Sequence, residues 1–210
     1  KMTIGVDPMW TAAILTIFVA AITLGGLQSI ATAASKIVPA MAVIYFLSTI
    51  GVLIVFADQV PSAIVMIMES AFTPTAAAGG FLGATVMMAI RNGVARGVFS
   101  NESGLGSAPI VAAAAKTKWP AEQGLISMTG TFIDTIIICT LTGLTLVVTG
   151  AWCGMENGAA LTNMAFTSAF PAFGGYMLMV GLVLFAFTTI LGWNYYCLLY
   201  TSPSPRDATL

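Results

Sequence analysis

Long apolar segments constrain the fold of this chain more than any other feature of its sequence. A helix needs roughly 20 mostly apolar residues to cross a bilayer. Five segments meet or approach that length, at residues 8–25, 37–57, a run that begins near residue 76, 125–148 and 176–196. With 58% hydrophobic and 7% charged residues, a chain of 210 residues could not bury its apolar side chains in a water-soluble domain. The sequence therefore predicts an all-α membrane protein.

Two shorter helices and a divergent tail complete the predicted organisation. Residues 61–72 are too short to span a membrane and fit a helix at its interface. Residues 107–115 fit a short helix that tolerates Pro109 in its first turn. The last residues become rich in Ser and Pro where a helix should continue, and they resemble a translated sequencing adapter. We therefore expect a membrane region over residues 1–196 and a non-native tail over residues 197–210.

The few charged residues predict how the chain is oriented. The 7 Lys and Arg nearly balance the 8 Asp and Glu, so no overall field points to nucleic acid. Basic residues in short loops favour the cytoplasmic side of a membrane. Lys36 lies between the first two predicted spans, and four more basic residues lie between the third and the fourth, at Arg91, Arg96, Lys116 and Lys118. The chain is therefore expected to start outside, with residues 91–121 facing the cytoplasm.

Residue types that the sequence lacks disfavour most enzymatic chemistry. It has no histidine, the commonest general base and metal ligand. Cys139, Cys153 and Cys197 show no CxxC spacing, so we expect unpaired thiols and no zinc. An intramembrane aspartyl protease needs two facing carboxylates, and only Asp134 lies well inside a long span. No selectivity sequence of a channel is visible either.

The third span is interrupted by glycines and arginines. Interrupted helix at membrane depth is tolerated only where protein or a water-filled cavity surrounds it. Its freed amides and carbonyls can then bind an ion or a carboxylate. We therefore predict a helix break near Asn92 and Gly93, or a few residues later towards Gly97, with substrate contacts there. The alternative is that the glycines allow close helix packing and the arginines mark the cytoplasmic end.

A second candidate site lies in the last span. Residues three and four apart share a helix face, so the Phe185 carbonyl can stand beside the hydroxyls of Thr188 and Thr189. Three neutral oxygens suit a hard monovalent cation better than a transition metal. Trp193 follows Thr189 at i+4 on the same face. The alternative is that both hydroxyls only bond back to the preceding turn.

Asp134 is a third candidate, because an intramembrane carboxylate is a functional-site hypothesis by default. One interpretation gives it a role in coupling transport to a proton or an ion. The other gives it a structural partner in the neighbouring helix, and on this interpretation we predict a pair with Arg96 or Arg91.

Three strings of residues resemble the sodium:alanine symporter family, also called alanine or glycine:cation symporters. They are Phe99-Ser-Asn-Glu-Ser-Gly-Leu-Gly-Ser-Ala-Pro109, Gly130-Thr-Phe-Ile-Asp-Thr135 and Phe185-Ala-Phe-Thr-Thr189. The likeness covers residues 8–196, and Ser103 stands where alanine is expected. It implies an inverted-repeat fold of leucine-transporter type, in which the five spans are core helices four to eight. The chain is then expected to be an internal fragment without core helices one to three, nine and ten.

The resemblance also implies a function and a site. The function is sodium-coupled symport of a small neutral amino acid, alanine or glycine, across the cell inner membrane. Carried over by position, Phe185, Thr188 and Thr189 are assigned to the sodium ion, and Trp193 is assigned to the substrate pocket. Asn92, Gly93 and Gly97, at the expected break, complete the predicted substrate contacts. Another cation-coupled solute transporter, or an intramembrane enzyme, is the alternative.

Overall fold

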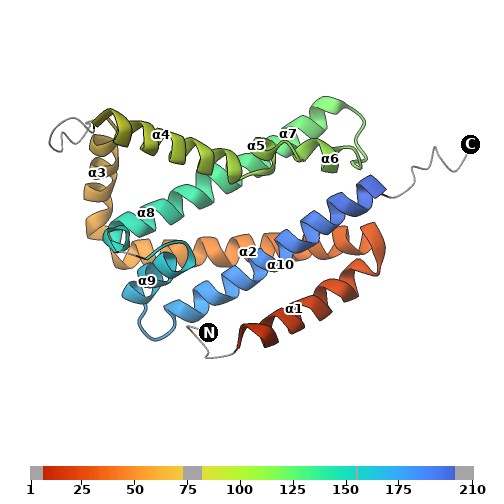
Figure 1. Ribbon diagram of the computed structural model, residues 1–210, viewed down its shortest axis with the longest axis horizontal. Coiled ribbons are helices and arrows are strands. Elements are labelled where there is room, and N and C mark those ends of the chain that lie inside the picture. The colour runs from red at the N-terminus through yellow and green to blue at the C-terminus, as the bar shows by residue number, and fades with distance from the viewer. Residues whose placement is uncertain (1–6, 73–81, 155, 202–210) are drawn as a thin grey trace, which may run out of the picture. The chain divides into compact units, whose positions relative to one another are not determined.

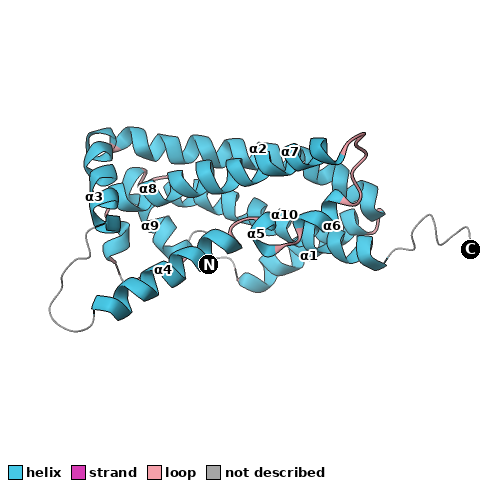
Figure 2. Cartoon of the chain, turned by 90° about the horizontal axis from the view of Figure 1, so that it is seen from above, coloured by secondary structure: helices cyan, strands magenta, loops and turns pink. Residues whose placement is uncertain are grey.

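The computed structural model describes residues 7–72, 82–154 and 156–201. Every regular element in these ranges is helical, which agrees with the predicted all-α class (Figures 1 and 2). The chain divides into two compact units. One comprises residues 1–48 and 170–210, the other comprises residues 49–169, and each is described by itself below.

Three helices build the first unit: α1 (Pro8–Thr23), the greater part of α2 (Gly26–Val55), and α10 (Gly174–Thr201). Asp7 caps α1 by accepting a hydrogen bond from the Met9 amide at 2.9 Å. A tight turn at Gly25 and Gly26 then reverses the chain. Gly26 has a φ of 75°, and a Cβ on Gly25 would lie 2.6 Å from the Cβ of Ser29, so the turn requires glycine at both positions.

A small apolar core joins the three helices of this unit. Ile30 of α2 packs with Phe187 and Leu191 of α10, and all three side chains are buried. Apolar side chains from α1 and from the same faces of α2 and α10 surround them, namely Leu15, Val19, Ile22, Ala33, Ile37, Tyr195 and Leu198. Ile30, Ala33 and Ile37 follow the i, i+3, i+7 spacing of one helix face. That stripe fixes α2 against α10.

The same stripe corrects one predicted boundary. We expected the second span to start at residue 37 after a loop at Ser35 and Lys36, but α2 starts at Gly26 and contains both residues. Residues 26–36 are helical because Ile30 and Ala33 have core partners, and because this segment is rich in alanine, the best helix former. Lys36 therefore lies in a helix and not in a loop between the first two spans.

The second unit contains the C-terminal end of α2 and the elements between it and residue 169. In chain order they are η1 (Ala57–Gln59), α3 (Val60–Phe72), α4 (Leu82–Phe99), α5 (Glu102–Leu105), α6 (Ala108–Ala112), α7 (Pro120–Thr131), the π-helical segment η2 (Phe132–Cys139), α8 (Thr140–Val148), η3 (Ala151–Cys153) and α9 (Ala159–Ala169). The predicted short helices at 61–72 and 107–115 correspond to α3 and α6. In Figure 1, α7 and α8 continue one another along one line, and α5 and α6 lie against α7.

Three helices in the described residues are long and apolar enough to cross a membrane: Gly26–Val55, Pro120–Val148 and Gly174–Leu199. They correspond to the second, fourth and fifth predicted spans. The first predicted span is apolar but shorter, over Met9–Thr23. The third corresponds to α4, whose 18 residues include Arg91 and Arg96, and its predicted start near residue 76 lies outside the described residues.

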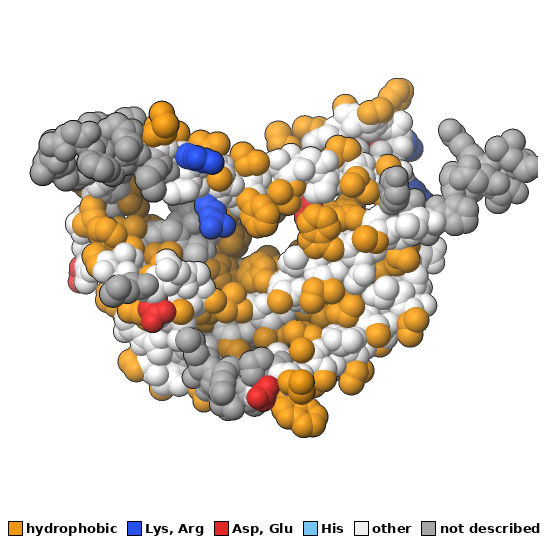
Figure 3. Space-filling view, in the orientation of Figure 1, with side chains coloured by type: hydrophobic (Ala, Val, Ile, Leu, Met, Phe, Trp, Pro, Cys, Tyr) orange, Lys and Arg blue, Asp and Glu red, His pale blue; other side chains and the backbone are white. Residues whose placement is uncertain are grey.

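The molecular surface is strongly apolar. Met9, Trp10 and Ile17 of α1 are 78%, 68% and 68% exposed, and Figure 3 shows many exposed apolar side chains and few charged ones on the visible face. An apolar surface this extensive fits a bilayer and not water. At the other end of the chain, α10 continues through Thr201, five residues past the predicted limit of the last span at residue 196. Residues 202–210 of the predicted tail lie outside the described residues.

Candidate ion and substrate sites

Helix α4 corrects the predicted position of the break. It continues without interruption through Asn92, Gly93 and Gly97 and ends at Phe99. Nothing lies within 4 Å of a Cβ built on Gly93 or Gly97, so these glycines leave open space on α4 and cost the helix only about 1 kcal/mol each. The break falls instead at Ser100 and Asn101, where Asn101 has an extended backbone (φ −134°, ψ 157°) and caps the next helix.

The residues after this break form a compact joint, which we define as residues 98–107. The Asn101 side-chain oxygen accepts a hydrogen bond from the Gly104 amide at 2.8 Å. A Cβ on Gly104 would lie 2.0 Å from the carbonyl oxygen of Val98, so the chain folds back closely enough to exclude any side chain there. Gly106 then has a φ of 78°, and the buried Ser107 donates its hydroxyl to the carboxylate of Glu102.

The joint binds to the helix that runs from α7 into η2. The hydroxyls of Ser100 and Thr135 lie 3.0 Å apart, and the Asn101 side-chain amide donates to the Thr135 hydroxyl at 3.0 Å. One turn earlier, the hydroxyls of Ser103 and Thr131 lie 3.0 Å apart. Thr131 and Thr135 are four residues apart and share a helix face. Together they hold the joint at two points.

Sequence reasoning missed these partners of the joint. Asn101, Ser103 and Thr131 belong to strings that resemble a known family, but no role was assigned to them. The i, i+4 spacing of Thr131 and Thr135 is the signal in the sequence that points to a shared polar face. It does not say what that face meets, because the partners lie 28 to 35 residues away in the chain.

Asp134 lies beside this contact, within η2. Its carboxylate oxygen Oδ2 accepts a hydrogen bond from the Thr135 hydroxyl at 3.4 Å, and the side chain is half-buried. The predicted pair with Arg96 or Arg91 is wrong: in the described part of the chain neither arginine forms an ion pair with Asp134. Both arginines are exposed on α4, upstream of the joint that contacts η2.

The second candidate site is one turn of α10. The Phe185 carbonyl accepts hydrogen bonds from the hydroxyl of Thr189 at 2.7 Å and from the hydroxyl of Thr188 at 3.1 Å. Thr188 also donates to the Leu184 carbonyl at 2.9 Å. The three predicted oxygens therefore converge, and in this state both hydroxyls bond back to the preceding turn.

Helix α2 packs on this turn from within the same unit. The Met41 sulfur lies 3.5 Å from the Thr188 hydroxyl, and the ring of Tyr45 meets that of Phe185 edge-on, with centroids 5.3 Å apart. A Cβ on Gly181 would be 3.5 Å from the Tyr45 ring, an ordinary contact distance. These contacts position the Thr188 side of the turn, whereas Thr189 is exposed.

Trp193 lies one turn further along α10. It is 52% exposed, and its ring packs edge-on against Tyr196 with centroids 5.6 Å apart. The structure thus places the predicted sodium ligands and Trp193 on neighbouring turns of one helix. Asn92, Gly93 and Gly97 share another helix, α4, which belongs to the other unit.

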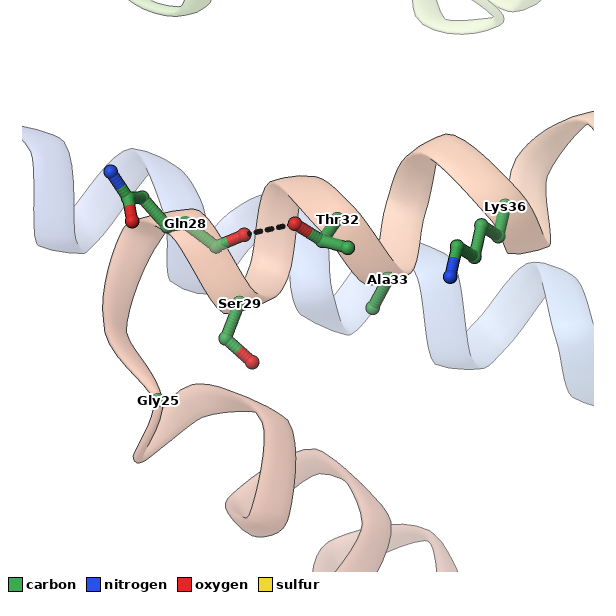
Figure 4. Close-up of a pocket in the computed structure, with 6 residues that line it drawn as sticks. All are labelled: Gly25, Gln28, Ser29, Thr32, Ala33 and Lys36. Carbon is green, nitrogen blue, oxygen red and sulfur yellow. Dashed lines mark hydrogen bonds between the residues drawn. The ribbon is translucent and has the colours of Figure 1, made fainter.

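An open polar groove of about 520 Å³ follows the start of α2. It is lined by Gly25, Gln28, Ser29, Thr32, Ala33 and Lys36, and contains none of the predicted site residues (Figure 4). The Thr32 hydroxyl donates to the Gln28 carbonyl at 2.8 Å, so that hydroxyl is already engaged within its own helix. Four of the six residues that line the groove have polar side chains.

Comparison with known proteins identifies the family. Residues 1–201 match the sodium:alanine symporter family. The chain belongs to that family. It is 55% identical to an uncharacterized transporter of Haemophilus influenzae, over 94% of this chain and 44% of the relative. It is 49% identical to the sodium/alanine symporter AgcS of Methanococcus maripaludis, over 91% of this chain and 42% of the relative.

More distant members of the sodium:alanine symporter family carry other substrate names. One relative, from Bacillus subtilis, is named a probable sodium/glutamine symporter and is 37% identical over 91% of this chain and 39% of its own length. The chain therefore spans less than half the length of the relatives described here. Family membership, together with the membrane-length helices, makes this chain part of a multi-pass protein of the cell membrane. It also confirms the resemblance carried by the three strings.

Proposed function

We propose that this chain is part of a sodium-coupled symporter of small neutral amino acids, alanine or glycine, in the cell inner membrane. Its family and the name of the 49% identical relative support the coupling to sodium and the choice of alanine. The proposed fold is the inverted repeat of leucine-transporter type, with the spans as core helices four to eight. This arrangement agrees with an outside start and with residues 91–121 on the cytoplasmic side.

The turn of α10 at Phe185, Thr188 and Thr189 carries the proposal. A carbonyl oxygen has two lone pairs, and a hydroxyl oxygen can rotate its hydrogen away while its lone pairs turn toward an ion. Each hydroxyl oxygen already lies within hydrogen-bond distance of the Phe185 carbonyl oxygen, so the turn offers three neutral hard ligands without rearrangement of the backbone. Because the relatives are more than twice as long, we expect further ligands from segments that this chain does not contain.

The proposed substrate contacts are Trp193 on α10 and Asn92, Gly93 and Gly97 on α4. Because α4 is continuous, its amides and carbonyls at Asn92 and Gly93 are not free to bind substrate, as a helix break would have made them. Gly93 and Gly97 support the proposed contact in another way: at i, i+4 spacing they leave a strip of open helix surface. An amino acid can approach a helix backbone closely along such a strip.

Uptake of labelled alanine by the complete protein in proteoliposomes tests the proposed function. We expect accumulation driven by an inward sodium gradient and its loss when choline replaces sodium at equal ionic strength. Unlabelled alanine, glycine and glutamine, added separately as competitors, will rank the substrates. Uptake that persists at full rate without sodium would contradict sodium coupling, and competition by glutamine alone would contradict the proposed substrate class.

Trp193→Ala tests the substrate pocket. Loss of a large ring beside the substrate should weaken alanine uptake and let bulkier amino acids compete, since an aromatic wall both contacts a ligand and limits its size. The sodium concentration for half-maximal uptake should change less than the alanine concentration does. Trp119→Ala is a matched control, because Trp119 is also exposed (71%) but lies just before α7 and outside the proposed site. Equal effects of the two changes on alanine uptake would show that Trp193 does not line the substrate pocket.

A further inference from the structure

We infer that Met41 of α2 is a positioning residue for sodium binding: its sulfur holds the hydroxyl hydrogen of Thr188, so that the Thr188 oxygen can turn its lone pairs toward the ion. The inference rests on the proposed sodium site at Phe185, Thr188 and Thr189, and it adds a second helix to that site. Met41 is not itself a ligand, because a thioether is soft and sodium prefers hard oxygen ligands. Its effect on the ion passes through Thr188.

The Phe185 carbonyl oxygen has more hydrogen-bond donors than lone pairs. A carbonyl oxygen carries two lone pairs. Within α10 the Thr189 amide takes one of them, since each helical amide donates to the carbonyl four residues earlier. The hydroxyls of Thr188 and Thr189 are directed at the same oxygen, at 3.1 Å and 2.7 Å. A sodium ion that binds this carbonyl therefore competes with both hydroxyl hydrogens.

The Thr188 hydroxyl has two other acceptors within reach. It lies 2.9 Å from the Leu184 carbonyl oxygen and 3.5 Å from the Met41 sulfur. The Leu184 carbonyl already accepts the Thr188 amide as part of the helix. The sulfur is a weak acceptor, but it is not part of the α10 hydrogen-bond ladder. Among the acceptors of this hydroxyl in the described residues, only Met41 comes from another helix.

The place of Met41 determines which way the Thr188 oxygen faces. Helix α2 packs on the Thr188 side of the turn, while Thr189 is exposed. A hydroxyl hydrogen that points at the sulfur leaves the lone pairs of the oxygen on the side away from α2. In that orientation Thr188 no longer donates to the Phe185 carbonyl. One of the two competing hydrogens is then removed from the carbonyl, and the Thr188 oxygen is itself free to accept the ion.

Packing within the first unit holds the sulfur in place. The Met41 side chain is buried, with 7% of its surface exposed. Tyr45 follows Met41 by one turn of α2, is also buried, and meets the Phe185 ring edge-on. The core of Ile30, Phe187 and Leu191 fixes the same two helices against each other nearby. A sulfur fixed by these contacts can set the direction of a hydroxyl, which a mobile surface side chain could not.

Equilibrium binding of radioactive sodium to the complete purified protein tests the inference. Met41→Leu keeps most of the side-chain volume but removes the acceptor, and swaps of this kind usually preserve the fold. We expect the dissociation constant for sodium to rise about threefold, which is about 0.7 kcal/mol at 1.4 kcal/mol per factor of ten. Met179→Leu is the matched control and should leave the constant unchanged. Met179 is also partly buried, in α10 of the same unit, but it lies six residues before Phe185.

A double-mutant cycle separates the proposed role from packing. Thr188→Val has no hydroxyl hydrogen to hold, so Met41→Leu added to it should leave the dissociation constant for sodium unchanged. Thr189→Val keeps the Thr188 hydroxyl, so the threefold effect of Met41→Leu should persist there. An equal threefold loss in the Thr188→Val background would mean that Met41 acts by packing alone, and would overturn the inference.

Met41→Gln decides the question if Thr188→Val binds sodium too weakly to measure. Glutamine is about as long as methionine and carries a carbonyl oxygen that accepts a hydrogen bond. We expect Met41→Gln to bind sodium more tightly than Met41→Leu, whereas a packing role predicts the reverse, because burying an amide is costly. Equal sodium binding by Met41→Leu and the unchanged protein would overturn this inference and leave the proposed sodium site standing. Absence of sodium binding by the unchanged protein would overturn the proposed function, and this inference with it.

Discussion

Replacing Thr189 with valine is expected to raise the sodium concentration for half-maximal alanine uptake about tenfold. Valine has the shape of threonine but no hydroxyl, so one of the three converging oxygens is lost while packing is preserved. Removal of one partner from a polar interaction of this kind costs about 1–3 kcal/mol, and 1.4 kcal/mol corresponds to a factor of ten. Uptake in the complete protein, measured over a range of sodium concentrations at saturating alanine, gives the value directly.

Thr16→Val is the matched control for this change. Thr16 lies in α1 of the same unit, and its hydroxyl bonds back to the Ala12 carbonyl at 2.8 Å, just as Thr189 bonds to Phe185. Both variants therefore lose a hydroxyl that bonds back to its own helix, but only Thr189→Val also loses a proposed sodium ligand. An unchanged sodium dependence in Thr189→Val, or an equal change in Thr16→Val, would place the ion site elsewhere.

Replacing Gly104 with alanine is expected to prevent the joint from forming. The added Cβ would sit 2.0 Å from the Val98 carbonyl oxygen, far inside any contact distance that real atoms adopt. The carbonyl belongs to the backbone and the Cβ is bonded directly to the Cα of residue 104, so neither can swing aside as the end of a flexible side chain would. Overpacking usually lowers the free energy of unfolding by about 1–3 kcal/mol, and we expect a clash with backbone to lower it by about 3 kcal/mol or more. The measurement is the yield of monodisperse protein in detergent, together with its midpoint of thermal unfolding.

Gly130→Ala provides the control for the joint. Gly130 lies in α7, next to Thr131, and nothing lies within 4 Å of a Cβ built on it. Alanine there should be neutral or should stabilise the helix by up to about 1 kcal/mol. If Gly104→Ala and Gly130→Ala give equal yields and midpoints, the close fold-back at Val98 does not exist in the protein.

Hydropathy predicted the long helices of this chain better than their ends. The spans at 125–148 and 176–196 correspond to continuous helices because both are long apolar runs, in which Asp134 is the one charged residue. The start of α2 was placed 11 residues late, since Ser35 and Lys36 look like a loop until Ile30 is seen to pack against Phe187 and Leu191. That contact joins segments more than 150 residues apart, and no local pattern encodes it.

For the candidate sites too, the sequence predicted features set by one helical turn better than features set by contacts between segments. The hydroxyls of Thr188 and Thr189 were expected beside the Phe185 carbonyl because one helical turn fixes their spacing, and both hydroxyls do bond to that carbonyl. Their role as sodium ligands stays a prediction. The break was predicted at Asn92 and Gly93 because glycine weakens a helix, but it occurs where Ser100 and Asn101 offer the backbone other partners. A side chain that caps the next helix ends α4 more effectively than a glycine that merely tolerates other conformations.

The π segment between α7 and α8 has a consequence for comparing this chain with its relatives. A π turn holds one residue more than an α turn, so η2 accommodates the equivalent of a single inserted residue. A relative that is one residue shorter here can close the turn to α geometry and still keep Thr131 and the buried Thr145 on the faces that they occupy in this chain. A one-residue gap in an alignment across residues 132–139 would therefore mark the loss of a widened turn and not a shift of the whole helix.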